Sequence, residues 1–77
     1  MFNKVVQIIS NRSGYKKEEI DISCRLADLG ISSINIIEIL MTIEYFSGIV
    51  VEYSSDFLTV GDLVKAIEEK GKSDNQR

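Results

Sequence analysis

The 77-residue sequence contains no histidine, no proline, no tryptophan and a single cysteine, Cys24. Without histidine the chain can form neither a Ser-His-Asp triad nor a histidine-containing metal site. A lone cysteine can form no disulfide within the chain and no thiolate cluster, so a reducing cytosol is the expected compartment. Glycine-rich phosphate loops and dinucleotide fingerprints are also missing. These absences predict a protein that is not an enzyme.

Long hydrophobic runs are missing as well. No segment approaches the roughly 20 apolar residues that span a bilayer, and the first residues lack the ordered regions of a signal peptide. The length corresponds to one domain, and 44% hydrophobic with 27% charged residues fits a soluble protein with a compact core. A chain of this size buries only about 60–65% of its unfolded surface, which leaves little room for a deep active site.

Basic residues are absent from the middle of the chain. Between Leu26 and Val64 the sequence has six acidic residues and no lysine or arginine, although the net charge is only −3. A negative field over this part favours basic protein partners. It argues against nucleic acid, whose phosphates need a basic stripe. An ordinary solvated acidic surface is the alternative explanation.

Apolar residues at helical spacing predict a helix near each end of the chain. The first covers residues 2–12 and ends at Gly14. The last begins after Thr59, where Asp62 completes an acidic variant of the capping box, and ends at Gly71. The core positions expected on these helices are Phe2, Val5, Val6, Ile8 and Ile9 in the first, and Val60, Leu63, Val64 and Ile67 in the last.

The central helix, expected over residues 33–46, has two apolar faces. One follows the pattern of a core-facing helix, and the other lies nearly opposite when residues are placed at 100° intervals. One small domain can hardly bury both, so the second face is either a contact surface or a sign that the helix lies between layers. The core-facing set is Ile36, Ile39, Leu40, Ile43 and Phe46, and the second set is Ile34, Ile37, Met41 and Tyr45.

A long loop, residues 15–31, is expected between the first and central helices. Loops of this length are uncommon in a compact domain unless they are anchored or functional. One short helical turn can form over residues 17–20. The expected core anchors are Ile20, Ile22 and Leu26.

A fourth, short helix is expected between the central and last helices. Gly48 can end the central helix in the left-handed conformation, and a cap at residues 54–56 can start a short helix that ends near Leu58. The predicted architecture is an all-α four-helix bundle with three longer helices, one short helix and a long first loop. Its single domain covers residues 1–71, and residues 72–77 are expected to form a disordered tail.

The start of the central helix carries a family resemblance. Residues 29–34, Leu-Gly-Ile-Ser-Ser-Ile, with the following Ile37, Glu38 and Met41, resemble the Leu-Gly-x-Asp-Ser-Leu-x-x-Val-Glu-Leu segment of acyl and peptidyl carrier proteins. The resemblance extends from about Val5 to Ile67. It includes residues 58–63, Leu-Thr-Val-Gly-Asp-Leu, which look like the Thr-Val-Gly-Asp start of the family's last helix.

This resemblance implies that Ser33 carries a 4′-phosphopantetheine arm, transferred from coenzyme A by a phosphopantetheinyl transferase. A helix N-terminus suits the attachment, because its unpaired N–H groups and dipole favour a phosphodiester. From the residues alone, Ser32 and Ser33 can equally be no more than a helix cap. Ser32 replaces the family's usual aspartate, which removes one negative charge beside the attachment site, and Ile34 replaces its leucine.

The resemblance also implies a partner surface on the second apolar face. Ile34, Ile37, Glu38 and Met41 match the family's partner-contact positions, and Tyr45 continues the face farther from Ser33. Such a face can dock as a helix in a groove, with the flexible Met41 adapting to different partners. Further candidates for electrostatic contacts are Glu44, Glu52 and Asp56.

The predicted function is a freestanding, monomeric, cytoplasmic carrier without nucleic-acid or membrane partners. It holds acyl or aminoacyl groups as thioesters and passes them between loading ligases, synthases and tailoring enzymes. The modest charge and Ser32 favour a specialised polyketide or nonribosomal peptide pathway over housekeeping fatty-acid synthesis. The alternative is an unmodified helical interaction or adaptor domain, whose second apolar face forms a dimer or adaptor interface.

Overall fold

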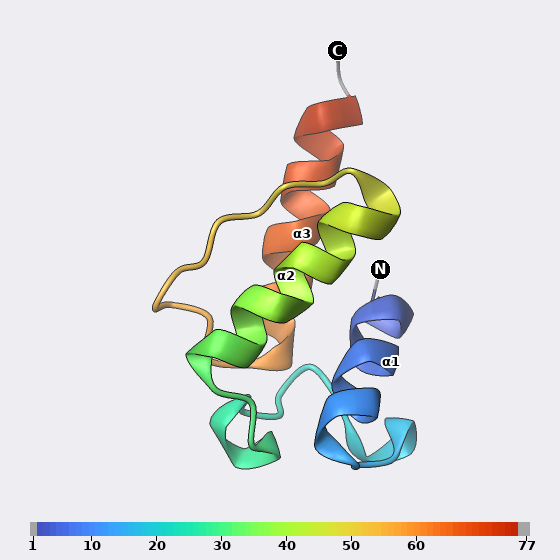
Figure 1. Ribbon diagram of the computed structural model, residues 1–77, viewed down its shortest axis with the longest axis vertical. Helices are drawn as coiled ribbons and strands as arrows, with labels where there is room; N and C mark the ends of the chain where they lie inside the picture. Colours follow the sequence, from blue (N-terminus) through green and yellow to red (C-terminus); the bar gives the residue numbers. More distant parts are fainter. Residues whose placement is uncertain (1, 76–77) are drawn as a thin grey trace.

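The computed structural model describes the backbone of residues 2–75 and the side chains of residues 2–72. Over this range it contains three α-helices and two short 3₁₀ helices, and no β-strand (Figure 1). The α-helices are α1 (Phe2–Ser13), α2 (Ser33–Ser47) and α3 (Val60–Asn75), and the 3₁₀ helices are η1 (Lys17–Glu19) and η2 (Ala27–Leu29). None of the described helices has the length and apolar character needed to cross a membrane.

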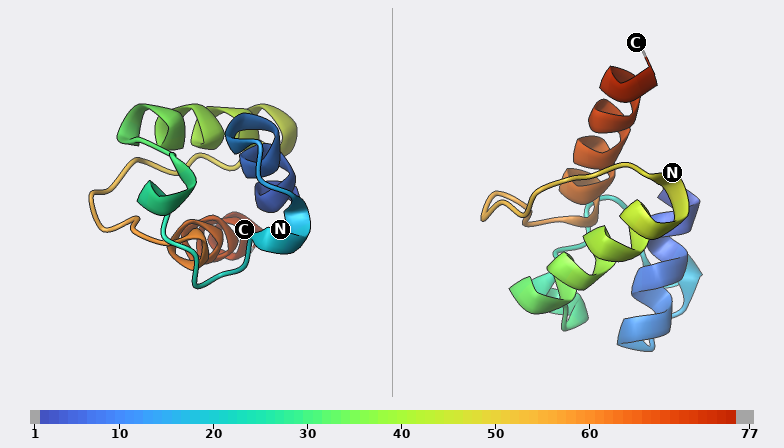
Figure 2. Two further views of the ribbon diagram at one scale, coloured as in Figure 1. Left: turned by 90° about the horizontal axis from the view of Figure 1, so that it is seen from below. Right: turned by 45° about the horizontal axis from the view of Figure 1, so that its top comes forward.

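The three helices enclose one aliphatic core. Helix α2 lies across α3, and α1 lies beside both and contacts each (Figure 2). Sixteen buried hydrophobic residues fill the space between them, and all are valine, leucine or isoleucine. The expected positions of α1 and α3 are in this core, except that Phe2 is only partly buried. The loop between α1 and α2 contributes Ile20, Leu26, Leu29 and Ile31.

Two predicted core residues, Phe46 and Ile22, are instead 62% and 61% exposed. Phe46 lies at the edge of the buried face of α2, on the side of α1, where its ring contacts Lys4 with Nζ 4.0 Å from the centroid. Ile22 faces outward, and it meets the start of α3 through its backbone carbonyl, which accepts a hydrogen bond from the Gly61 N–H at 3.0 Å. Helical periodicity found the centre of the buried face of α2, but not where it ends.

The predicted short helix over residues 54–58 does not form. The Asp56 N–H donates to Ser54 Oγ and the Phe57 N–H to the Ser54 carbonyl, which makes a single turn at residues 55–56. Directly afterwards the Leu58 carbonyl accepts from the Leu26 N–H at 2.9 Å, so the chain is held extended against the first loop. The predicted four-helix bundle is therefore wrong by one helix within the described residues.

The last helix is longer than predicted. Gly71 has no positive φ and does not end the helix as predicted, and α3 continues to Asn75. Residues 72–75, placed in a disordered tail by the sequence, are helical in their backbone, and residues 76–77 lie outside the described residues. The predicted left-handed glycine at the end of α2 is confirmed, because Gly48 has φ 77° and its N–H donates to the Glu44 carbonyl.

Backbone hydrogen bonds join the first loop to the start of α3. The Val60 N–H donates to the Cys24 carbonyl at 2.9 Å and the Gly61 N–H to the Ile22 carbonyl at 3.0 Å. A Cβ at Gly61 would lie 3.0 Å from this same Ile22 oxygen and 3.3 Å from Ile22 Cβ. The absence of a side chain at Gly61 is thus what lets loop and helix approach.

Gly61→Ala should destabilise the protein by roughly 1–2 kcal/mol, because the crowded neighbour is backbone and cannot rotate away. The matched control is Gly71→Ala, whose Cβ would meet only the flexible end of the Ile49 side chain at 3.1 Å. Urea unfolding should therefore show a lower midpoint for the first variant and an unchanged or higher midpoint for the second. Equal midpoints for the two variants would refute this close-packing role for Gly61.

The predicted capping box at the start of α3 is present. One oxygen of the Asp62 carboxylate accepts from the Thr59 and Leu58 N–H groups, both at 3.0 Å, and Thr59 Oγ1 accepts from the Asp62 N–H. The backbone hydrogen bonds from Thr59 and then Leu58 lower the pKa of Asp62 below its ordinary value, because they stabilise the carboxylate. The first loop and α3 thus meet at a capped helix end.

Asp62→Ala should cost roughly 1 kcal/mol of unfolding free energy near neutral pH, because two backbone donors lose their acceptor. A lowered folded-state pKa stabilises the protein above the unfolded-state value, and the contribution is lost as the pH falls through the folded-state value. The stability difference between wild type and variant should therefore be full above about pH 5 and shrink below about pH 4. A difference in denaturation midpoint that stays constant down to pH 3 would contradict it.

Candidate functional site

Ser33 is the first residue of α2, and the turn before it is firmly anchored. Gly30 takes the left-handed conformation at φ 75° and ends η2, with its N–H donating to the Ala27 carbonyl. On either side of this glycine, Leu29 and Ile31 are buried in the core. The Ile31 N–H also donates to the Leu26 carbonyl at 2.9 Å. The start of α2 is therefore anchored to the core, while Ser33 itself stays exposed.

Ser32, and not Ser33, caps the helix. Ser32 Oγ accepts from the Asn35 N–H at 3.3 Å, and Asn35 Oδ1 accepts from the Ser32 N–H at 3.0 Å. This reciprocal pair satisfies two backbone donors that a helix start leaves open. From the sequence, Ser32 and Ser33 were alternative caps, and Asn35 was not identified as part of the cap. Its position three residues after Ser32 is the signal that points to it.

Because Ser32 is the cap, Ser33 has no structural task at the helix start. No hydrogen bond to its hydroxyl is found among the residues that the structure describes, and the N–H groups of Ser33 and Ile34 are likewise without a partner there. Two free donors at the positive end of a helix dipole can bind the oxygens of a phosphodiester on the adjacent hydroxyl. This end of α2 therefore fits a phosphate-linked group on Ser33.

The second apolar face of α2 is uncovered. Ile34, Met41 and Tyr45 are 68%, 63% and 84% exposed, and Ile37 is also exposed. The opposite face, formed by Ile36, Ile39, Leu40 and Ile43, is buried. Of the two explanations that the sequence left open, a helix between two layers is therefore wrong. An apolar stripe runs along the surface from the Ser33 end of the helix.

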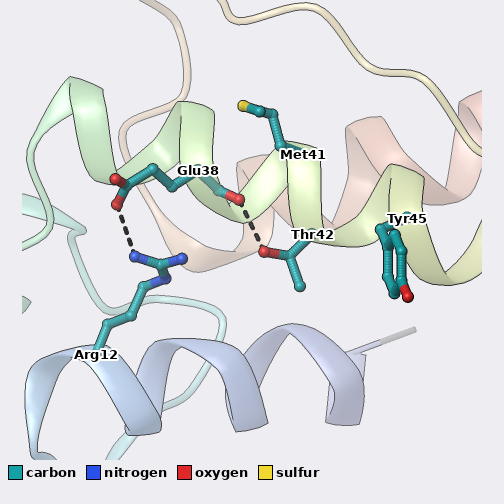
Figure 3. Close-up of a pocket in the computed structure, with 5 residues that line it drawn as sticks. All are labelled: Arg12, Glu38, Met41, Thr42 and Tyr45. Carbon is teal, nitrogen blue, oxygen red and sulfur yellow. Dashed lines mark hydrogen bonds and ion pairs between the residues drawn. The ribbon is translucent and has the colours of Figure 1, made fainter.

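The sequence predicts an acidic surface without bases around α2, but in the structure Glu38 is paired with a base. Arg12 of α1 reaches across to α2, and its Nη1 lies 2.6 Å from Glu38 Oε1 (Figure 3). Asn35 Nδ2 donates to the same oxygen at 3.4 Å, which connects the ion pair to the helix cap. Arg12 is 26 positions from Glu38, so helical spacing gave no sign of this contact. A base thus enters the region that appeared purely acidic along the chain.

The two flanks of the apolar stripe carry different groups. Toward α1, an open hollow of about 340 Å³ is lined by Arg12, Glu38, Met41, Thr42 and Tyr45 (Figure 3). On the other flank Glu44 lines a smaller hollow, of about 80 Å³, beside Val51 and Tyr53 of the segment that follows α2. No basic group is paired with Glu44 in the described part of the chain.

The Ser33 hydroxyl has no catalytic base beside it among the described residues. The chain lacks histidine, and no base is hydrogen-bonded to the Ser33 hydroxyl within the described range. No cluster of three or more potential metal ligands occurs in that range either. Among the described residues nothing is therefore placed to activate the Ser33 hydroxyl.

Comparisons with known proteins agree with this geometry. Residues 3–67 match the family model described as the phosphopantetheine attachment site. An acyl carrier protein of Streptococcus pyogenes serotype M1 is 35% identical over 72 residues, covering 94% of this chain and 97% of the relative. An acyl carrier protein of Rickettsia bellii is 41% identical over 69 residues, covering 86% of this chain and 85% of the relative.

The family match covers most of the chain and therefore identifies its prosthetic group as covalently attached phosphopantetheine. Both named relatives are acyl carrier proteins. On this match, the chain belongs to the phosphopantetheine-binding acyl carrier protein family.

Proposed function

We propose that the phosphopantetheine of this protein is attached to Ser33 Oγ. The observation that carries the proposal is the exposed Ser33 hydroxyl, which takes no part in the cap formed by its neighbour Ser32. In the transfer, Ser33 Oγ forms a bond to the phosphorus of coenzyme A that bears the pantetheine. The nucleotide part leaves as adenosine 3′,5′-bisphosphate, and the hydroxyl proton passes to a base of the phosphopantetheinyl transferase.

After the transfer, this chain's task is to hold the arm in place and keep it in solvent. The unpaired N–H groups of Ser33 and Ile34 donate to the new phosphodiester, and the helix dipole favours its negative charge. Bound phosphopantetheine supplies a terminal thiol that holds an acyl or aminoacyl cargo as a thioester. A tethered cargo reaches each partner enzyme at high effective concentration, since it no longer has to diffuse freely.

The partner surface is the uncovered stripe of Ile34, Ile37, Met41 and Tyr45 together with Glu38. Transferases, loading ligases, synthases and tailoring enzymes would dock there, next to the arm. We further propose a freestanding, monomeric carrier in the cytoplasm. Ser32 and the modest net charge of −3 favour a specialised polyketide or nonribosomal peptide pathway.

Loading at Ser33 is tested by intact mass after incubation with coenzyme A and a broad-specificity phosphopantetheinyl transferase. The wild type should gain one phosphopantetheine, and Ser33→Ala should gain none. The matched control is Ser32→Ala, which should still be loaded although loss of the cap costs about 1 kcal/mol of stability. An unmodified wild type would favour the adaptor function, and a label on another serine would move the site.

The docking role of the stripe is tested by Met41→Glu. This change places a charge in the middle of the exposed apolar face, so kcat/KM for loading should fall about tenfold through a higher KM. The control is Val50→Glu, which adds the same charge at an exposed apolar residue outside α2. Equal effects of the two substitutions on loading would remove the stripe from the partner surface.

The cargo and pathway are tested by mass spectrometry of the protein isolated from its native host. A β-keto or extended polyketide intermediate, or an aminoacyl group, on Ser33 would support a specialised pathway. A series of saturated fatty acyl groups differing by two carbons would instead assign the protein to fatty-acid synthesis.

A further inference from the structure

Helix α1 places two cations along one side of the exposed stripe of α2. Arg12 contacts Glu38 near the Ser33 end, and Lys4 lies over the ring of Phe46 near the far end. On the other side of the stripe Glu44 stands without a basic partner among the described residues. The flank of the stripe toward α1 therefore carries two positive charges and one negative charge. The opposite flank carries the negative charge of Glu44.

Arg12 belongs to the stripe's own surface. Its side chain is 32% exposed, and it lines the hollow that Met41 and Tyr45 also line. Only one guanidinium nitrogen, Nη1, is bonded to Glu38, and the other donors have no partner within the described residues. A guanidinium carries five N–H donors in a planar fork that suits carboxylates. Arg12 can therefore hold Glu38 and bind a second carboxylate at the same time.

We propose that Arg12 is a specificity residue of the docking surface. It favours partner enzymes that place a carboxylate opposite the α1 flank of α2 and disfavours those that place a base there. The inference rests on the proposed function, since it concerns the surface through which the carrier meets its enzymes. It adds the chemistry of the partner: an apolar centre with an acidic group on the Arg12 side and a basic group on the Glu44 side.

The reason is charge complementarity on two opposite flanks. A partner base that approaches Glu38 meets Arg12 at close range and is repelled, whereas a partner carboxylate finds unused donors. Glu44 has the opposite preference. A partner that satisfies both flanks can bind α2 in only one rotational orientation about the helix axis, and this orientation directs the Ser33 end toward one part of the partner.

The test compares Arg12→Glu with Lys65→Glu, which makes the same change of net charge at an exposed residue of α3. The probe is a broad-specificity phosphopantetheinyl transferase with a basic carrier-binding surface, and the readout is kcat/KM for loading of Ser33. Arg12→Glu should be loaded about two- to fivefold faster than Lys65→Glu, the range that an exposed charge pair produces. Equal rates would overturn the proposal.

The second arm reverses the probe. Single Lys→Glu or Arg→Glu changes are made across the carrier-binding surface of the transferase. With at least one of these transferase variants, the wild-type carrier should be loaded two- to fivefold faster than the Arg12→Glu carrier. No transferase variant should change which of the wild-type and Lys65→Glu carriers is loaded faster. If no transferase variant loads the wild-type carrier faster than the Arg12→Glu carrier, the preference for a carboxylate is overturned.

Two further measurements keep the outcomes separate. Arg12→Gln and Lys65→Gln repeat the comparison with milder changes in case Arg12→Glu disturbs the packing of α1, and circular dichroism checks helix content in all variants. Failure of the wild type to be loaded at all would refute the proposed function itself. Equal loading of the Arg12 variants and their Lys65 controls would refute only the role of Arg12.

Discussion

The structure depends on one constraint, which is that the two other helices, α1 and α3, can cover only one apolar face of α2. Helices α1 and α3 bury Ile36, Ile39 and Ile43 in an entirely aliphatic core, and nothing in the described chain lies over Ile34, Met41 and Tyr45. A domain of this size has too little interior to bury more. The exposed apolar stripe is therefore a direct result of chain length and helix patterning, and it starts beside the serine that we assign to the prosthetic group.

The start of α2 combines two tasks in adjacent residues. Ser32 and Asn35 satisfy the open end of the helix, while Ser33 stays in solvent. In the family pattern an aspartate stands where this chain has Ser32, and a serine is an equally good helix cap. The replacement keeps a capping side chain and removes a charge. In addition, the ion pair of Arg12 with Glu38 makes the surface near Ser33 less negative than the order of charges along the chain suggests.

The sequence was sufficient for features that depend on residues close together in the chain. The buried stripes, Gly48 at the end of α2, the Thr59–Asp62 cap and the two faces of α2 all follow from spacings of three or four residues. It failed where distant segments meet. The hydrogen bond between Leu26 and Leu58 holds the chain extended where a fourth helix was predicted. The Arg12–Glu38 contact likewise depends on how α1 packs against α2, which helical periodicity does not fix.

The all-aliphatic core also has a spectroscopic consequence. The chain has no tryptophan, and its three tyrosines, Tyr15, Tyr45 and Tyr53, are all exposed. Unfolding therefore moves no buried fluorophore into water, and ultraviolet emission is a poor monitor of the folding transition. The same emission is well suited to report on surface encounters, because Tyr45 stands at the far end of the uncovered stripe, where its ring forms an edge-to-face pair with that of Phe46. In this protein, intrinsic fluorescence reports contact with other molecules better than it reports the integrity of the fold.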